Sequence, residues 1–175
     1  MKSDFALVPF AKNTAPPVKV RGEIERQNNQ LAIAYRLMSN EMLIPKPANL
    51  PLRQFDLWEH TCCELFLGVK DSPQYWEFNL SPAGHWNVFR MSDYRQNLAE
   101  EMAFETLPFQ VCDRADYLEI TLNIDLARII PPKQHLEVGI TAVIEDRQNQ
   151  LSYWALTHPG KAADFHLRSS FAIAL

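Results

Sequence analysis

Glycine and clustered positive charge are scarce in this chain, and each scarcity excludes a class of site. The 175 residues include five glycines, which leaves little room for a glycine-rich loop that binds phosphate. The net charge is −4, and Lys and Arg are scattered singly among acids. Binding to nucleic acid needs a basic stripe, so we expect no nucleic acid among the partners.

Cysteine is also scarce, and the three residues form no redox or metal motif. No Cys-x-x-Cys pair is present, and Cys62 and Cys63 are adjacent in the chain. Neighbouring side chains of a strand point to opposite faces, which disfavours a disulfide between them. The sequence likewise has no His-x-x-x-His, no His-Glu-x-x-His and no Asp-rich calcium loop. We expect reduced, mostly buried thiols.

Long apolar runs are missing too. No run approaches the length that crosses a membrane, and residues 1–10 lack the apolar stretch and cleavage site of a signal peptide. These features predict a cytoplasmic protein without a membrane partner. The 47% hydrophobic and 22% charged residues are typical of a globular protein, and residues 1–175 suit a single domain.

Alternation of apolar and polar residues with a period of two dominates the pattern. It is clearest in residues 31–38, 117–124 and 136–144. Such alternation predicts strands with one buried and one solvated face, as in antiparallel sheets. The sequence therefore predicts an all-β fold, an antiparallel β-sandwich resembling a jelly roll, with about ten short strands.

Turn and loop signals separate these strands. Hairpin turns are expected at residues 27–30, 82–84 and 146–149. The segment 41–51 holds three prolines and is expected to be a loop. One short helix is expected at 125–130, where Asp125 is placed to cap it and two prolines follow.

Aromatic residues and carboxylates gather in one part of the chain. Residues 58–86 hold three of the four tryptophans together with Glu59, Glu64 and Glu77. A sugar ring offers apolar C–H faces for stacking and hydroxyls that need hydrogen-bond partners. A core would use the tryptophans but gains little from the carboxylates. The combination therefore indicates a carbohydrate site.

The period of two also predicts which side chains share a face. Glu64 falls on the face opposite Leu65 and Leu67, and Asn79 shares its face with Glu77 rather than with the apolar residues of its strand. Such a face suits a binding surface, although an ordinary solvated face has the same pattern. Trp58 precedes its strand and is expected at a strand end, where it either contacts ligand or closes one end of the sandwich.

A third segment, residues 153–166, ends a strand with two aromatic residues and opens into a loop. The loop contains two histidines and Asp164, and loops of this kind often hold small-molecule sites. The alternative is structural: Asp164 would cap a turn and His166 would bond to the backbone.

Catalytic motifs are weak. No Gly-x-Ser-x-Gly elbow is present. Glu59, Glu64 and Glu77 are candidates for the carboxylate pair of a sugar hydrolase, but that role needs a defined separation that a sequence does not specify. We therefore expect a protein that is not an enzyme, with a sugar-modifying enzyme as the weaker alternative.

Residues 58–67, 77–88 and 153–166 resemble DOMON-like domains, which are similar to family 9 carbohydrate-binding modules. The resemblance runs from about residue 18 to the end. It implies a β-sandwich in which two tryptophans clamp a sugar while an acid and amides hold its hydroxyls. Trp58 and Glu64 match the first tryptophan and the acid, Trp154 is the expected second tryptophan, and Asn79 is a candidate hydroxyl partner.

The resemblance also raises two cofactors. Family 9 modules bind structural calcium, for which no ligands are assigned here. Other DOMON-type domains resemble cytochromes that hold haem between a methionine and a histidine, so haem is the alternative ligand. The leading hypothesis is a non-catalytic module that binds a small carbohydrate or polyol between Trp58 and Trp154, facing each other across an open cleft.

Overall fold

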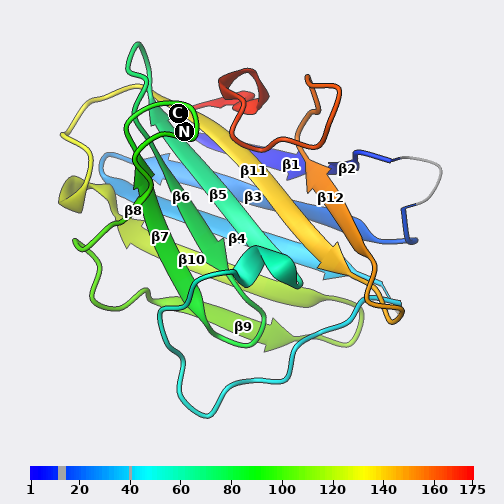
Figure 1. Cartoon of the computed structure of the whole chain (residues 1–175). Coiled ribbons are helices and arrows are strands. Elements are labelled where there is room, and N and C mark those ends of the chain that lie inside the picture. Colours follow the sequence, from blue (N-terminus) through cyan, green and yellow to red (C-terminus); the bar gives the residue numbers. More distant parts are fainter. Residues whose placement is uncertain (12–14, 40) are drawn as a thin grey trace.

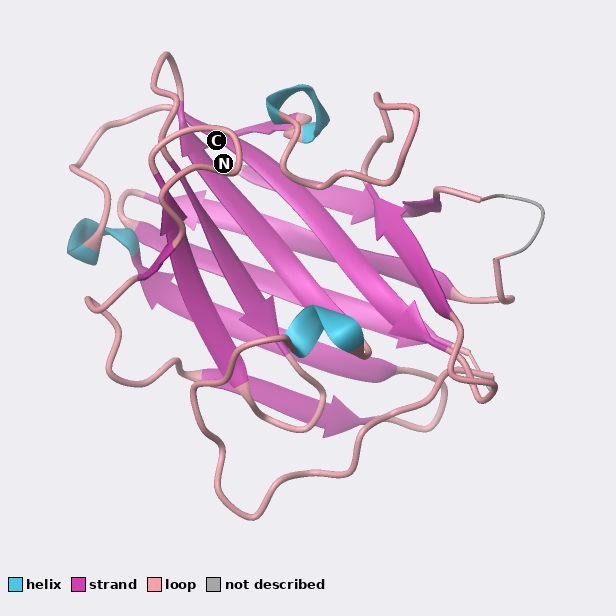
Figure 2. Ribbon diagram, viewed as in Figure 1, coloured by secondary structure: helices cyan, strands magenta, loops and turns pink. Residues whose placement is uncertain are grey.

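The computed structural model describes residues 1–11, 15–39 and 41–175. Two antiparallel sheets pack face to face, which confirms the predicted all-β sandwich (Figure 1). Helical structure in the described residues is limited to three 3-10 turns (Figure 2). No helix in this part of the chain is both long and apolar enough to span a bilayer.

The first sheet has five strands and includes both long hairpin strands of the N-terminal third. Its order is β1 (Lys2–Ala6), β3 (Lys19–Gln27), β4 (Gln30–Met38), β10 (Leu118–Asp125) and β9 (Phe109–Asp113). Its strands alternate between buried and exposed residues, so one face is dry and the other meets solvent.

The second sheet has eight strands and brings together the segments singled out by their aromatic residues. Its order is β2 (Val8–Pro9), β12 (Leu151–Ala155), β11 (Leu136–Glu145), β5 (Cys62–Val69), β6 (Tyr75–Leu80), β7 (Trp86–Met91) and β8 (Ala99–Glu100), with β13 (Ile173–Ala174) also paired to β11. The described residues thus form thirteen strands rather than about ten, because several have only two residues.

The predicted turns are present. Asn28 adopts the left-handed conformation in the β3–β4 turn, as Asn149 does in the β11–β12 turn, and asparagine tolerates this conformation well. The expected helix is the single 3-10 turn η2 (Leu126–Arg128), where the carboxylate of Asp125 accepts from the Ala127 backbone N–H at 3.0 Å.

The main core lies between the sheets. Ile24, Ile33, Leu122, Phe78 and Ile140 are among its buried residues. The hydroxyl of Tyr35, on the first sheet, donates to the backbone carbonyl of Glu64 on the second at 2.7 Å. This bond satisfies a polar group inside the core and links the two sheets.

The outer face of the eight-stranded sheet is covered as well. All six residues of β6 are buried, as are seven of the eight in β5. The 3-10 turn η1 (Leu57–Glu59) lies in front of β5 in Figure 1. Phe165 and Phe171, in the segment after β12, belong to a second apolar cluster that also contains Phe66 and Phe89. These covering segments leave a hollow, open to solvent on one side, on this face of the sheet.

Candidate functional site

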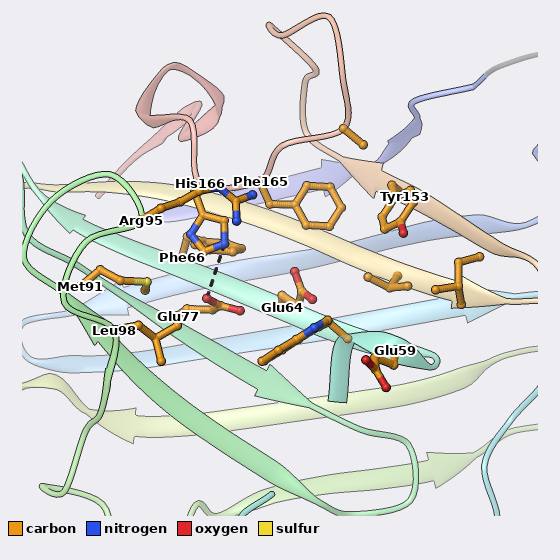
Figure 3. A pocket seen from close by; sticks show the side chains of 14 residues that line it. Glu59, Glu64, Phe66, Glu77, Met91, Arg95, Leu98, Tyr153, Phe165 and His166 are labelled. Carbon is orange, nitrogen blue, oxygen red and sulfur yellow. Dashed lines mark ion pairs between the residues drawn. The ribbon is translucent and has the colours of Figure 1, made fainter. Parts of the chain in front are cut away.

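A cavity of about 490 Å³ opens on this outer face. Its floor consists of side chains from β5, β6, β7 and β11, including Glu64, Phe66 and Glu77. Its walls come from η1, from the segment after β7, from β12 and from the segment after β12 (Figure 3). The size falls within the range of small-molecule sites.

Glu64 is a buried acid whose carboxylate is oriented by a neighbouring strand. It is 2% exposed, and its Oε2 accepts from the hydroxyl of Thr141 on β11 at 2.9 Å. No hydrogen bond within the described residues reaches Oε1. Every fully buried side-chain oxygen of these residues has a hydrogen-bond partner, so Oε1 is not fully buried. Oε1 therefore keeps access to the cavity.

Glu77 is the second buried acid of the floor. It is 5% exposed, and its Oε1 accepts from the side-chain amide of Asn79 at 2.9 Å. Its Oε2 lies 3.9 Å from Nε2 of His166 (Figure 3). Both acids thus have one oxygen held by a neutral donor and the other left toward the cavity.

Burial raises the pKa of both carboxyls. The negative charge of Glu77 raises the pKa of Glu64 further, whereas the bond from Thr141 lowers it. The pKa of Glu77 is raised by burial and partly lowered by Asn79 and Arg95. Near neutral pH these two groups hold protons more readily than ordinary carboxyls.

His166 is held in one orientation by Tyr75. Its Nδ1 lies 2.9 Å from the phenol oxygen, which also accepts from the backbone N–H of Arg95 at 3.2 Å. Burial and the charge of Arg95 lower the pKa of His166 to about 4, so the ring is neutral at pH 7. The contact with the phenol fixes the ring so that Nε2 faces Glu77.

Asp164 anchors the wall that carries His166. It accepts from Arg95 at 2.9 Å, from the Tyr94 hydroxyl at 2.5 Å and from the His166 backbone N–H at 3.1 Å. Although burial raises the pKa of Asp164, these bonds lower it overall. Asp164 is therefore charged, and its charge is matched by Arg95. Asp164 thus caps a turn, as the structural alternative expected, through its bond from the His166 backbone N–H. This turn shapes the wall of the cavity.

Aromatic side chains also line the cavity. Trp58, on η1, is half-buried and meets Phe89 edge to face, with ring centroids 5.9 Å apart. Tyr153, on β12, is 40% exposed and meets Phe165 in the same way at 6.1 Å. The cavity thus combines partly accessible rings with buried carboxylates.

The structure separates the expected site residues into two groups. Trp58 and Glu64 both line the cavity. Asn79 is fully buried beneath it and orients Glu77, so it reaches the cavity through that residue. These three lie close together, since Glu64 pairs with Asn79 across β5 and β6 and shares the cavity with Trp58.

Trp154 is the exception, and the expectation that it faces Trp58 across a cleft is wrong. It is 4% exposed, packs in the core between the sheets and donates its indole N–H to Ser152 at 2.9 Å. Because neighbouring residues of a strand point to opposite faces, it is Tyr153 that lines the cavity. The sequence Tyr-Trp offered one aromatic candidate for each face of the strand, and the polar Ser152 shares the face of Trp154.

Arg95 was not anticipated as a cavity residue, and Phe165 was not singled out within the segment 153–166. Both lie in irregular segments far apart in the sequence, and no periodic pattern indicates where such segments fold. Their placement depends on contacts between distant parts of the chain, such as the pairing of Arg95 with Asp164.

Calcium ligands were not assigned from the sequence. Among the described residues, no three His, Cys, Asp or Glu side chains converge to hold a metal ion.

Comparisons with known proteins find similarity at the level of structure. No family model and no curated protein sequence matches the chain. A crystal structure of a protein from Bacteroides uniformis, described as a "putative carbohydrate-binding protein", matches with a TM-score of 0.77. The match covers 97% of this chain and 84% of that chain at 12% sequence identity. At this identity the likeness establishes a shared fold.

Proposed function

We propose that this protein is a non-catalytic binding module for a small carbohydrate, which it holds in the cavity on the outer face of the eight-stranded sheet. One observation carries the proposal: two buried, oriented carboxylates, Glu64 and Glu77, lie in the same cavity as the accessible rings of Trp58 and Tyr153. The fold shared with the Bacteroides uniformis protein, and the description of that protein, support it.

The carboxylates suit hydroxyl recognition because they are already oriented. Thr141 and Asn79 each hold one oxygen of a carboxylate, so the free oxygens can accept from sugar hydroxyls with little loss of side-chain freedom. Trp58 offers a ring for the apolar face of the sugar. We expect a dissociation constant between about 1 μM and 1 mM, as for one stacked ring and a few hydrogen bonds.

Tryptophan fluorescence tests this proposal directly. The other three tryptophans, Trp76, Trp86 and Trp154, are at most 5% exposed and lie in the core, so a ligand-dependent change reports on Trp58. Titration with mono- and oligosaccharides should give a saturable change that Trp58→Ala abolishes. Tyr117→Ala, in the turn between β9 and β10 of the other sheet, is the matched control and should bind normally. A folded protein that responds to no sugar would contradict the proposal.

Haem, the alternative ligand, has one observation in its favour and does not fit the site. Met91 and His166 both line the cavity. However, Nδ1 of His166 is bonded to Tyr75 and Nε2 is directed at Glu77, so neither nitrogen is oriented toward open space. We therefore expect purified protein mixed with haem to show no shifted Soret band.

A further inference from the structure

We infer that the sugar bound here carries a positively charged amino group, which is placed between Glu64 and Glu77. This inference rests on the proposed function, because it names the class of sugar that the same cavity selects.

The first argument is the absence of a balancing cation. Within the described residues, His166 is the one basic side chain within 4.0 Å of either carboxylate, and its burial beside Arg95 disfavours the charged form of the ring. Arg95 also lines the cavity, but its guanidinium is paired with Asp164 at 2.9 Å. Two acids are therefore buried together without an ion pair to a Lys or Arg side chain of the described residues, and Arg95 acts on Glu77 only from a longer distance.

Buried carboxylates of this kind are costly unless something neutralises them. A proton does so in the empty cavity, in keeping with the raised pKa values of the pair. A ligand ammonium group would do so in the complex, with N–H donors for the free oxygens of both acids. A neutral hydroxyl also donates to a carboxylate, but it brings no charge.

The second argument is the composition of the walls. Phe66, Phe165 and Tyr153 contribute rings to the cavity, and Figure 3 shows Glu64 and Glu77 directed into the same space beside Phe66 and His166. Aromatic rings attract a nearby cation through their quadrupoles. Glu59 adds a third acid to the lining. An ammonium group fits this set of contacts better than an anionic or neutral substituent does.

Calorimetric titration with four probes tests the inference at neutral pH and low salt. The probes are glucosamine, glucose, N-acetylglucosamine and tetramethylammonium. Glucosamine should bind at least about tenfold more tightly than glucose or its N-acetylated derivative, since only the free amine carries the charge. Equal affinities for all three sugars would overturn the inference and leave the proposed function standing.

Tetramethylammonium separates the remaining outcomes. If it binds and no sugar does, the cationic site is supported and carbohydrate binding fails. If none of the four probes binds to folded protein, both conclusions fail.

Variants of the two acids and a measurement of proton release test whether the amino group binds between Glu64 and Glu77. Glu64→Gln and Glu77→Gln should each reduce the preference for glucosamine over glucose, whereas Glu105→Gln, an exposed acid outside the cavity, should leave it unchanged. If a cavity variant does not fold, the wild type still provides a test. Titration of tetramethylammonium in two buffers of different ionisation enthalpy should reveal proton release on binding, and glucose should release none. Absence of proton release with bound tetramethylammonium at a pH where the pair is protonated would contradict the placement between the acids.

Discussion

The phenol oxygen of Tyr75 lies 2.9 Å from Nδ1 of His166, and this contact joins β6 to the segment that follows β12. The same oxygen accepts from the backbone N–H of Arg95. One hydroxyl group therefore connects the floor of the cavity to two of its walls. The orientation of His166 toward Glu77 depends on it.

Tyr75→Phe should lower the free energy of unfolding by about 1–2 kcal/mol, because it removes a hydrogen bond and leaves two polar groups without their partner. It should also weaken ligand binding, since the ring of His166 loses the bond that orients it. Urea denaturation and titration measure the two effects. Tyr94→Phe removes an exposed hydroxyl from the same region and should cost less. An equal or greater loss in Tyr94→Phe would contradict this role of Tyr75.

His166 should make the protein less stable in acid. Its folded pKa is lowered from 6.5 to about 4 by burial and by Arg95, so below pH 6.5 the unfolded chain takes up a proton that the folded protein does not. The stability contributed by neutral His166 is full above that pH and is lost as pH falls toward 4, by up to about 3 kcal/mol. Unfolding free energies measured across this range should fall less steeply in His166→Asn.

Glu64 and Glu77 should have the opposite effect. Their folded pKa values are raised above 4.5, so between that value and neutral pH the folded protein binds more protons than the unfolded chain. Their contribution is fully present below pH 4.5 and is lost as pH rises. The unfolding free energy of Glu64→Gln should therefore decline less than that of the wild type between about pH 5 and pH 8. A steeper decline in the variant would show that Glu64 is not the group responsible.

Replacing Trp58 and replacing Trp154, the two tryptophans of the predicted sugar clamp, should have different effects on stability and binding. Trp154→Ala should cost about 3–5 kcal/mol of unfolding free energy, because it leaves a cavity between the sheets. Trp58→Ala should cost about 1 kcal/mol, as expected for a half-buried residue, and abolish binding. Denaturant unfolding and sugar titration distinguish them. Trp154→Phe, which keeps most of the packing, should bind normally; loss of binding in the folded variant would return Trp154 to the site.

The sequence by itself determined the class of the fold and which residues share a face of each strand. Alternation with a period of two is a local property, because successive side chains of a strand point to opposite sides. For this reason Glu64 could be placed opposite Leu65, and Asn79 beside Glu77, and both placements agree with the burial and contacts observed. The turns could also be predicted because turn preference is a local property: Asn28 and Asn149 tolerate the left-handed conformation that their turns require.

Only the tertiary structure decided which of two neighbouring aromatic residues faces the core and how the irregular segments come together around the cavity. At Tyr153 and Trp154 both faces are aromatic, so the choice depends on the register of β12 against β11, where Trp154 pairs with Ala142. Arg95 and His166 enter the cavity through contacts with Asp164 and Tyr75, which join segments about 70 and 90 residues apart. Such contacts arise from packing between distant segments, and a period read along one strand carries no information about them.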